Sequence, residues 1–489
     1  MSKSTTVHTT RLARVGGSFR DPSGHVYRRD DRIIRTVTKV GKEQFDFVRE
    51  SGLFELLIRD GRLLPFELLE GTALPEGFDE SVSYALEVPK LEFISFPYEW
   101  PFPALKAAAL FHLDIQRAAL ERNVTLSDAS AYNVQFIGAA PTFIDHLSFR
   151  RYEPGEMWSG HRQFCEQFLV PLLLRSLFGI PHNAWYRGSL EGIQTVEFSR
   201  LLTWRHYLNK NLLTHVVLQS WLQRSAETTL QGPDFDKTAV KGERALPVEA
   251  YRKLVMGLRH WIDSLEPLRT SKSTWQDYAK ANSYQVDELG QKAAFVRDFA
   301  AQHRPRQLWD FGCNIGAFSR AALEGGAQYV VSFDFDQGAL DACYAEARAS
   351  QLPIQSVVMD MANVSPNQGW MGIEREGLVS RRSADALIAL AVVHHLAISR
   401  NIPFGELLDW LLDLAPCGVI EFVPKPDPMV QKLLALRADI FDDYTWAFFT
   451  HCIAKRARID RILRIGQYGR TLVSYIRHDY EEIRRNCLQ

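Results

Sequence analysis

The sequence predicts an α/β protein whose C-terminal half is a doubly wound, mostly parallel Rossmann-like sheet preceded by an α+β domain. Three observations predict this fold class. From about Trp275 onward, short apolar runs alternate with longer helical stretches, which indicates βαβ units covered on both faces. A strand, a glycine-containing turn and a helix follow one another at residues 308–319. The chain has 489 residues, which is too many for one ordinary core.

The C-terminal elements follow from this alternation in chain order. Runs rich in Val, Ile, Leu and Phe predict five strands and one late additional strand, at 307–311, 329–334, 354–360, 385–392, 418–423 and 469–476. Amphipathic stretches between them predict helices at 316–324, 337–349, 404–414 and 429–437. A basic run at 455–464 is interpreted as a solvated face.

The N-terminal half has weaker patterns. They predict two short strands around an Asp-Asp turn within 25–37, a helix over 42–58, a strand over 91–96 and a long helix over 103–122. A polar segment over 228–244 and an amphipathic helix over 248–265 follow. We therefore expect an N-terminal domain at 1–227, a linker with a connecting helix at 228–274 and a second domain at 275–489.

Composition excludes some classes of function. The formal net charge is -1, so nothing global favours nucleic acid or an anionic membrane. No apolar run approaches the roughly 20 residues of a spanning helix, and the N-terminus lacks the apolar core of a signal peptide, which together predict a cytoplasmic protein. No metal site is expected, because the cysteines are scattered and form no C-x-x-C pair: Cys165, Cys313, Cys343, Cys417, Cys452 and Cys487.

The turn at 308–319 is the most informative segment. Gly312 and Gly316 carry no Cβ, so a ligand can approach the backbone closely. The N-terminus of the following helix offers unpaired N–H groups to a phosphate or a carboxylate. Asp334 and Asp360 end the next two strands, at the edge where open α/β sheets bind ligands. An acid at position 334 can accept hydrogen bonds from both ribose hydroxyls. An acid at position 360 can accept a hydrogen bond from an adenine amino group.

These residues resemble the class I S-adenosylmethionine-dependent methyltransferases from about Trp275 to the C-terminus. Asp310-x-Gly312-x-x-x-Gly316 matches the first motif of that family, with Asn314 in place of its middle glycine. The resemblance implies S-adenosylmethionine as the cofactor. It also implies a set of cofactor-binding residues: Asp310, Gly312, Asn314, Gly316, Asp334, Asp336, Asp360, Met361 and Leu390. Asp334 lies at the usual ribose-binding position, and Asp336 is the alternative.

Three residues are candidates for catalysis. His394 and His395 follow the fourth strand, and histidine has a suitable pKa range for a general base. The alternative is that one of them packs against or caps the next helix. Glu421, near the end of the fifth strand, could orient an acceptor, and its alternative is an ion pair with Lys425.

A second resemblance lies in the N-terminal half. Asp128, Asn133 and Asp145 have the spacing of the catalytic loop and metal-binding aspartate of protein-kinase-like and aminoglycoside-phosphotransferase-like folds. There is no glycine-rich loop, and Arg35 stands where a strand lysine is expected. We therefore expect a degenerate kinase-like domain; polar turns on an unrelated α+β domain are the alternative.

The leading hypothesis is methyl transfer from S-adenosylmethionine to a small-molecule, glycan, lipid or carrier-held acceptor. A bifunctional phosphotransferase–methyltransferase and a non-catalytic S-adenosylmethionine-binding scaffold are the alternatives. The segment Ala391-Val-Val-His394 follows the fourth strand, where amino-methylating enzymes of nucleic-acid bases carry Asn-Pro-Pro-Tyr or Asp-Pro-Pro-Tyr. This argues against methylation of bases by that mechanism and leaves ribose methylation open.

Overall fold

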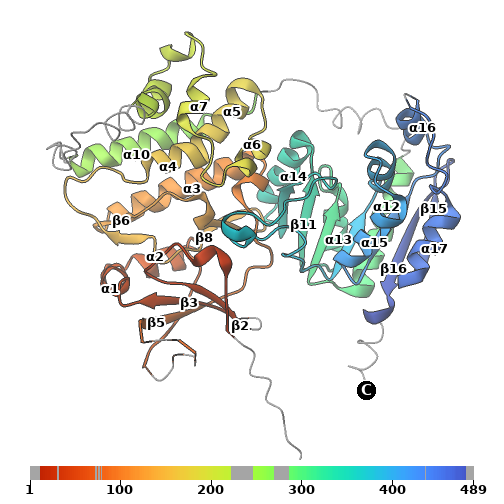
Figure 1. Ribbon diagram of the computed structural model, residues 1–489, viewed down its shortest axis with the longest axis horizontal. Coiled ribbons are helices and arrows are strands. Elements are labelled where there is room, and N and C mark those ends of the chain that lie inside the picture. Colours follow the sequence, from red (N-terminus) through yellow and green to blue (C-terminus); the bar gives the residue numbers. More distant parts are fainter. Residues whose placement is uncertain are drawn as a thin grey trace, which may run out of the picture.

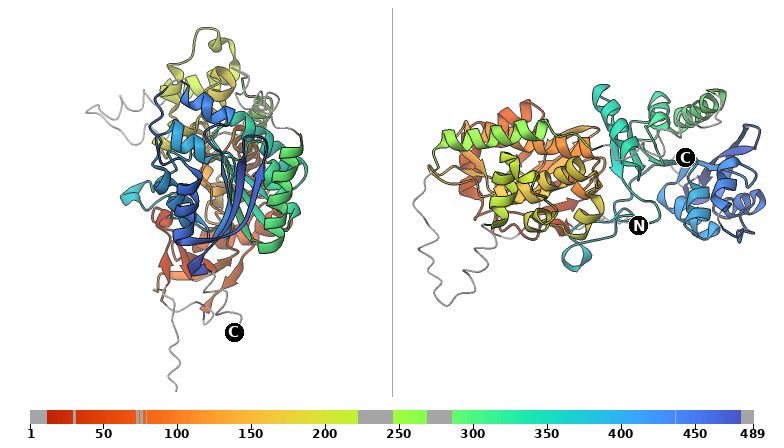
Figure 2. Two further views of the ribbon diagram at one scale, coloured as in Figure 1. Left: turned by 90° about the vertical axis from the view of Figure 1, so that its right-hand side faces the viewer. Right: turned by 90° about the horizontal axis from the view of Figure 1, so that it is seen from above.

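The protein consists of two halves that lie side by side along its longest axis (Figure 1 and Figure 2). The computed structural model describes residues 12–29, 32–71, 74, 77–78, 80–221, 246–268, 286–435 and 437–480. No helix within these ranges combines the length and the apolar character that crossing a membrane requires. The expected Asp-Asp turn at 30–31 and the polar segment at 228–244 lie outside the described residues.

The C-terminal half is built on a seven-stranded sheet. Its order is β12-β11-β10-β13-β14-β16-β15. The first five strands are parallel in the 3-2-1-4-5 arrangement of doubly wound sheets, and an antiparallel pair completes the sheet. The strands are β10 (Gln307–Phe311), β11 (Tyr329–Asp334), β12 (Ile354–Val358), β13 (Ala386–Ala389), β14 (Cys417–Phe422), β15 (Ala457–Ile465) and β16 (Arg470–Arg477). The Rossmann-like expectation is therefore confirmed.

Helices cover both faces of this sheet. Alternate strand residues point to opposite sides, so Leu308 packs in one core with α12–α14, and Trp309 packs in the other with α15 and α17. The helices are α12 (Val286–His303), α13 (Ala317–Glu324), α14 (Gln337–Ala349), α15 (Phe404–Leu414), α16 (Pro428–Leu434) and α17 (Trp446–Arg456). The sequence predicted α14 and α15 residue for residue.

The basic run at 455–464 was not recognised as a strand. Most of it forms β15, an edge strand that pairs with β16 in the sheet formed by the described residues. A register shift between Ile459 and Arg461 breaks the alternation of exposed and buried side chains, and that alternation is the signal a sequence pattern needs.

The N-terminal half begins with a five-stranded antiparallel sheet of order β1-β2-β3-β5-β4. Its strands are β1 (Ala13–Arg14), β2 (Val26–Arg29), β3 (Arg32–Thr38), β4 (Glu67–Leu69) and β5 (Val82–Val88). The expected helix over 42–58 is two helices, α1 (Lys42–Glu50) and α2 (Leu53–Arg59). They are separated at Gly52, whose φ of 71° lies in the left-handed region.

A helical region lies above the first sheet in the view of Figure 1, around the buried helix α3. Its helices are α3 (Phe102–Leu120), α4 (His161–Phe164), η5 (Cys165–Leu169), α5 (Val170–Phe178), α6 (Asn183–Gly188), α7 (Thr195–Ser199), η6 (His206–Leu208), α8 (Lys210–Leu212), η7 (Leu213–Val217) and α10 (Val248–Asp263). Short strands form two antiparallel pairs, β6 (Val124–Leu126) with β9 (Phe149–Arg151) and β7 (Val134–Ile137) with β8 (Ala140–Phe143). The expected connecting helix is α10, and it packs on α3 through the Gln116–Tyr251 hydrogen bond of 2.9 Å.

The segment 92–99 joins the two halves, and the strand expected at 91–96 is wrong. This segment has no regular structure before the 3-10 helix η3 (Pro97–Glu99). The apolar alternation has another cause: the Phe93 ring packs edge-on against Trp309 and Phe333, each at 5.8 Å between ring centroids. Glu99 forms a buried ion pair with Arg381 of the C-terminal half, at 2.5 Å. The hydrophobic core is therefore continuous between the halves.

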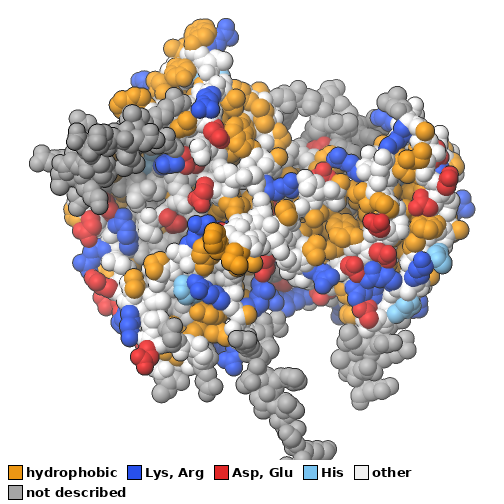
Figure 3. All heavy atoms as spheres, viewed as in Figure 1, with side chains coloured by type: hydrophobic (Ala, Val, Ile, Leu, Met, Phe, Trp, Pro, Cys, Tyr) orange, Lys and Arg blue, Asp and Glu red, His pale blue; other side chains and the backbone are white. Residues whose placement is uncertain are grey.

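The upper end of the N-terminal half exposes hydrophobic side chains (Figure 3). They lie on the helical segment 201–221, among them Trp204 at 71% and Leu208 at 77% exposure. Arg200, Arg205 and Lys210 lie in or beside the same segment.

Candidate functional site

The turn after β10 adopts left-handed backbone conformations at three positions. Gly312, Asn314 and Gly316 have φ values of 71°, 53° and 79°. A Cβ on Gly312 would lie 2.5 Å from a methyl group of Val392, and one on Gly316 would lie 2.7 Å from the Sγ of Cys343. Glycine is therefore required by the fold at both positions, and the turn leads directly into α13 at Ala317.

Asp310 lies beneath this turn. Its carboxylate is 1% exposed and accepts a hydrogen bond of 2.5 Å from Ser319 Oγ, on α13. Burial raises the pKa of Asp310 to about 7. The side chain thus ties the end of β10 to the first turn of α13.

Asp334 and Asp336 play different parts at the end of β11. Each carboxylate oxygen of Asp334 accepts a backbone N–H, from Asn314 at 2.8 Å and from Asp336 at 2.9 Å. Burial raises the pKa of Asp334. Asp336 is the N-cap of α14 and accepts from the Ala339 N–H at 3.0 Å. Asp334 therefore contacts the glycine turn, whereas the Asp336 carboxylate holds a helix end.

Asp360 follows β12 at the same edge of the sheet. Its carboxylate accepts from the Ala362 N–H at 2.9 Å and forms an ion pair of 3.1 Å with Arg400. Met361 is partly buried, and Leu390, just after β13, is buried. The Asp334 carbonyl accepts the Met359 N–H at 2.8 Å, which ties the two strand ends together.

The two histidines lie just after β13. His394 is 1% exposed, its Nδ1 has no hydrogen-bond partner among the residues that the structure describes, and burial lowers its pKa well below the usual value. Burial lowers the pKa of His395 to about 4. The two rings are 4.2 Å apart. Both imidazoles are therefore neutral at physiological pH.

Glu421 does not pair with Lys425, contrary to the alternative drawn from the sequence. Lys425 pairs with Asp439 at 2.7 Å. Glu421, on β14, is fully buried and accepts two bonds of 2.6 and 2.7 Å from the ammonium group of Lys292, on α12. Its second oxygen also accepts the Ala391 N–H at 2.9 Å. Local sequence could not reveal this pair, because Lys292 lies 129 residues before its partner.

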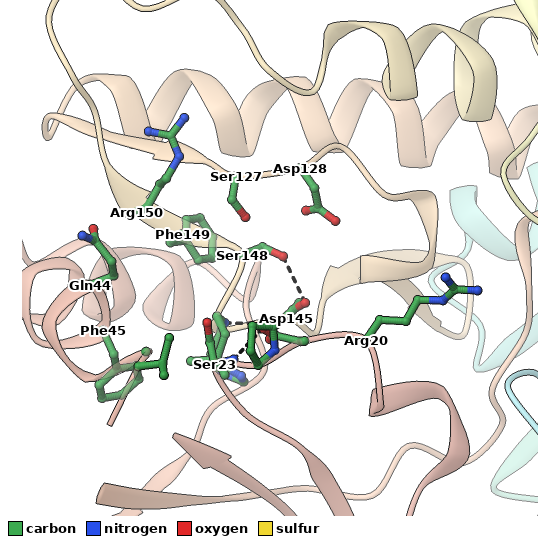
Figure 4. A pocket seen from close by; sticks show the side chains of 16 residues that line it. Arg20, Ser23, Gln44, Phe45, Ser127, Asp128, Asp145, Ser148, Phe149 and Arg150 are labelled. Carbon is green, nitrogen blue, oxygen red and sulfur yellow. Dashed lines mark hydrogen bonds between the residues drawn. The ribbon is translucent and has the colours of Figure 1, made fainter. Parts of the chain in front are cut away.

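The N-terminal half contains a cleft of about 410 Å³ between the first sheet and the helical region (Figure 4). Asp128 and Asp145 both line it, and Asn133 donates to Asp128 at 3.1 Å. Arg35 of β3 forms an ion pair with Asp145. Burial and the charge of Asp145 raise the pKa of Asp128 to about 7. The three residues singled out by their spacing therefore lie together.

The fold defines a Rossmann-like α/β protein. Its glycine turn lies where the strand order reverses, between β10 and β13, which is where open α/β sheets bind ligands. The chain belongs to the family of nodulation protein NoeA. It is 44% identical to that protein from Rhizobium meliloti (strain 1021) over 469 residues, which cover 96% of this chain and 97% of the relative. No known protein-family model matches the sequence.

Solved structures show a weaker likeness. The N-methyltransferase NodS from Bradyrhizobium japonicum WM9 is 12% identical, with a TM-score of 0.30 over 42% of this chain and 100% of that one. Magnesium protoporphyrin IX methyltransferase from Synechocystis PCC 6803 is 16% identical, with a TM-score of 0.30 over 50% of this chain and 100% of that one. The bifunctional kinase-methyltransferase WbdD is 17% identical, with a TM-score of 0.28 over 45% of this chain and 46% of that one. Likeness at this level says nothing about the chemistry of this chain.

Proposed function

We propose that this protein is a methyltransferase that uses S-adenosylmethionine. The observation that carries the proposal is the glycine turn with Asp334 and Asp360 at one edge of the sheet. Both carboxylates stand at the carboxyl ends of neighbouring parallel strands, beside the point where the strand order reverses. The same residues carry the sequence resemblance to class I methyltransferases.

Each residue of this edge has a role in the proposal. The turn from Gly312 to Gly316, held over β10 by Asp310, receives the carboxylate of the methionine part, because the start of α13 favours negative charge. Asp334 accepts the ribose hydroxyls, because it ends β11 directly beside the glycine turn, whereas Asp336 caps α14. Asp360, Met361 and Leu390 contact the adenine.

The residues suit such a ligand. The two oxygens of the Asp334 carboxylate have about four lone-pair sites. The N–H groups of Asn314 and Asp336 donate to this carboxylate, and hydroxyl donors can bind it as well. When bound, S-adenosylmethionine would supply an activated methyl group on a sulfonium. The protein then has to position the acceptor, exclude water and accept a proton if the acceptor is a hydroxyl or an amine.

Calorimetry on the full-length protein tests the proposal. We expect binding of both S-adenosylmethionine and S-adenosylhomocysteine. If neither ligand binds, both the proposed site and the proposed reaction are contradicted. Binding without methyl transfer to any acceptor would instead favour the scaffold alternative.

The acceptor is proposed to be a small molecule, a glycan or a carrier-held group. The near-neutral net charge of -1 supports this over nucleic acid, and a second folded half beside the sheet edge offers a surface for a bulky acceptor. The name of the NoeA relative refers to nodulation and specifies no acceptor.

His395 is proposed as the general base, with Glu421 as a positioning residue. His395→Ala is expected to lower kcat about 100-fold, within the usual range for a lost base, and to leave cofactor affinity unchanged. The bond from Ala391 N–H to Glu421 fixes the turn that carries both histidines. Burial lowers the pKa of His395 to about 4. His395 therefore remains deprotonated as the pH falls to about 5, and we expect kcat to be unchanged over that range.

The measurement is S-adenosylhomocysteine formation, with small-molecule and glycan fractions as the source of acceptor. His451→Ala is the control, because His451 is exposed on α17 and outside the site. Equal turnover of the wild type and His395→Ala would eliminate the base role.

A second candidate function concerns the N-terminal cleft. The juxtaposition of Asp128, Asn133 and Asp145 favours a kinase-like origin, and we propose that the domain is degenerate and serves in substrate docking. The Arg35 guanidinium engages the Asp145 carboxylate that would otherwise bind magnesium.

We therefore expect the full-length protein to show no binding of ATP with Mg²⁺ at concentrations up to about 1 mM, equivalent to a free energy weaker than roughly -4 kcal/mol. The same titration of Asp145→Ala is the matched control. Tight, magnesium-dependent binding that Asp145→Ala abolishes would instead establish the bifunctional alternative.

A further inference from the structure

A cluster of metal-type ligands lies in the helical region of the N-terminal half, and its residues line neither the N-terminal cleft nor the glycine turn. It consists of His161 on α4, Cys165 at the start of η5 and His215 in η7. One ligand atom from each residue lies within 4.8 Å of the other two. The His161 Nε2 is 2.8 Å from the His215 Nδ1 and 3.8 Å from the Cys165 Sγ.

These separations are close to those of a tetrahedral metal centre. Metal–nitrogen bonds of about 2.0–2.1 Å and metal–sulfur bonds of about 2.3 Å place neighbouring ligand atoms roughly 3.3 to 3.6 Å apart. The observed 2.8 and 3.8 Å lie on either side of those values, so small side-chain rotations would suffice. His161 and Cys165 are four residues apart on one continuous helical segment and therefore face the same side.

The surroundings hold the three side chains in place. The indole of Trp158 lies against His161, at 5.4 Å between centroids, and that of Trp261 stacks on His215 at 5.9 Å. Two of the three ligand-bearing segments, η5 and η7, are π-helical turns. Such turns are rare and are frequent at functional sites. Three segments far apart in sequence, at 158–165, 213–217 and 261, thus converge on one buried point.

Cysteine binds a metal as the thiolate, so a bound ion would displace the Cys165 thiol proton, which leaves to the solvent.

We propose that His161, Cys165 and His215 bind one Zn²⁺ ion. Two neutral nitrogens and one thiolate form a donor set that zinc prefers, and water completes the fourth position. The ion would fasten η7, and with it the exposed segment 201–221, to α4. The sequence pattern could not reveal this site, because 50 residues separate His215 from Cys165.

The first test is metal content of the full-length protein, produced without a histidine tag, incubated with Zn²⁺ and then gel-filtered. We expect about one zinc per chain in the wild type and in Cys452→Ser, and almost none in Cys165→Ser. Cys452 is the matched control, because it is also a buried free thiol but lies on α17. Equal zinc in the wild type and Cys165→Ser would overturn the proposal.

The second test needs no variant, so a folding failure of Cys165→Ser cannot obscure the result. Metal-free wild type is titrated with Co²⁺. We expect visible bands of tetrahedral Co²⁺ together with a near-ultraviolet thiolate-to-cobalt band, both saturating at about one equivalent and both lost on addition of Zn²⁺. A titration without the thiolate band would mean that the three residues are a hydrogen-bonded core cluster only.

Discussion

Asp334→Ala is expected to weaken the binding of S-adenosylhomocysteine roughly 100-fold or more. A hydrogen bond to a charged acceptor contributes about 1.5–3 kcal/mol, and the proposed site loses two of them to the ribose. The substitution also removes the acceptor of the Asn314 and Asp336 N–H groups, so the glycine turn is held less firmly. The measurement is calorimetry on the full-length protein, with thermal unfolding to verify that the variant is folded.

Asp336→Ala is the matched control for this experiment. It removes the N-cap of α14, which costs about 1 kcal/mol of stability, but it leaves the Asp334 carboxylate in place. We expect its affinity to change less than about threefold. The reverse result, with affinity lost in Asp336→Ala and kept in Asp334→Ala, would assign the ribose to Asp336.

Lys292→Met is expected to lower the free energy of unfolding by about 3–5 kcal/mol, because it leaves Glu421 charged in the core without its main partner. The two side chains are 2% and 0% exposed. Arg470 is the next cation, at 3.9 Å from the Glu421 Oε1. It also pairs with Asp427 at 2.6 Å, so it compensates only in part. Chemical unfolding followed by tryptophan fluorescence gives the measurement.

Arg297→Met is the control on the same helix. Arg297 pairs with Glu324 on the surface, where the side chains are 47% and 58% exposed, and such pairs contribute about 0–1 kcal/mol. The double variant Lys292→Met/Glu421→Gln should recover much of the lost stability, since no unpaired charge remains. A loss in Lys292→Met no larger than that in Arg297→Met would show that the buried pair is not needed for stability.

Much of the C-terminal half could be predicted because its signals are local. Strand β13 is apolar throughout, β11 begins with the apolar run Tyr329–Val331, and helices such as α15 have clear amphipathic periodicity. The glycine turn and the acids at 334 and 360 occupy the expected strand ends. In contrast, β15 escaped prediction because its apolar alternation is irregular.

The remaining features depend on residues far apart in sequence. The apolar alternation around Phe93 predicts a strand, but the Phe93 ring instead packs against Trp309 of the C-terminal half. The alternative for Glu421, an ion pair with the nearby Lys425, is wrong, because the fold supplies Lys292 as its partner. A pattern within one sequence does not show which distant side chains lie next to each other. The cluster of His161, Cys165 and His215 is therefore apparent only from the folded structure.

The segment at 92–99 has a consequence for how the protein loses its structure. Phe93 is buried among aromatic rings of the C-terminal sheet, and Glu99 shares a buried charge pair with Arg381. Pulling the halves apart would expose that apolar surface to water and leave two unpaired charges behind, which is unfavourable. The two halves should therefore melt together in a single cooperative transition, and neither should be obtained as a soluble fragment by cutting the chain between residues 268 and 286.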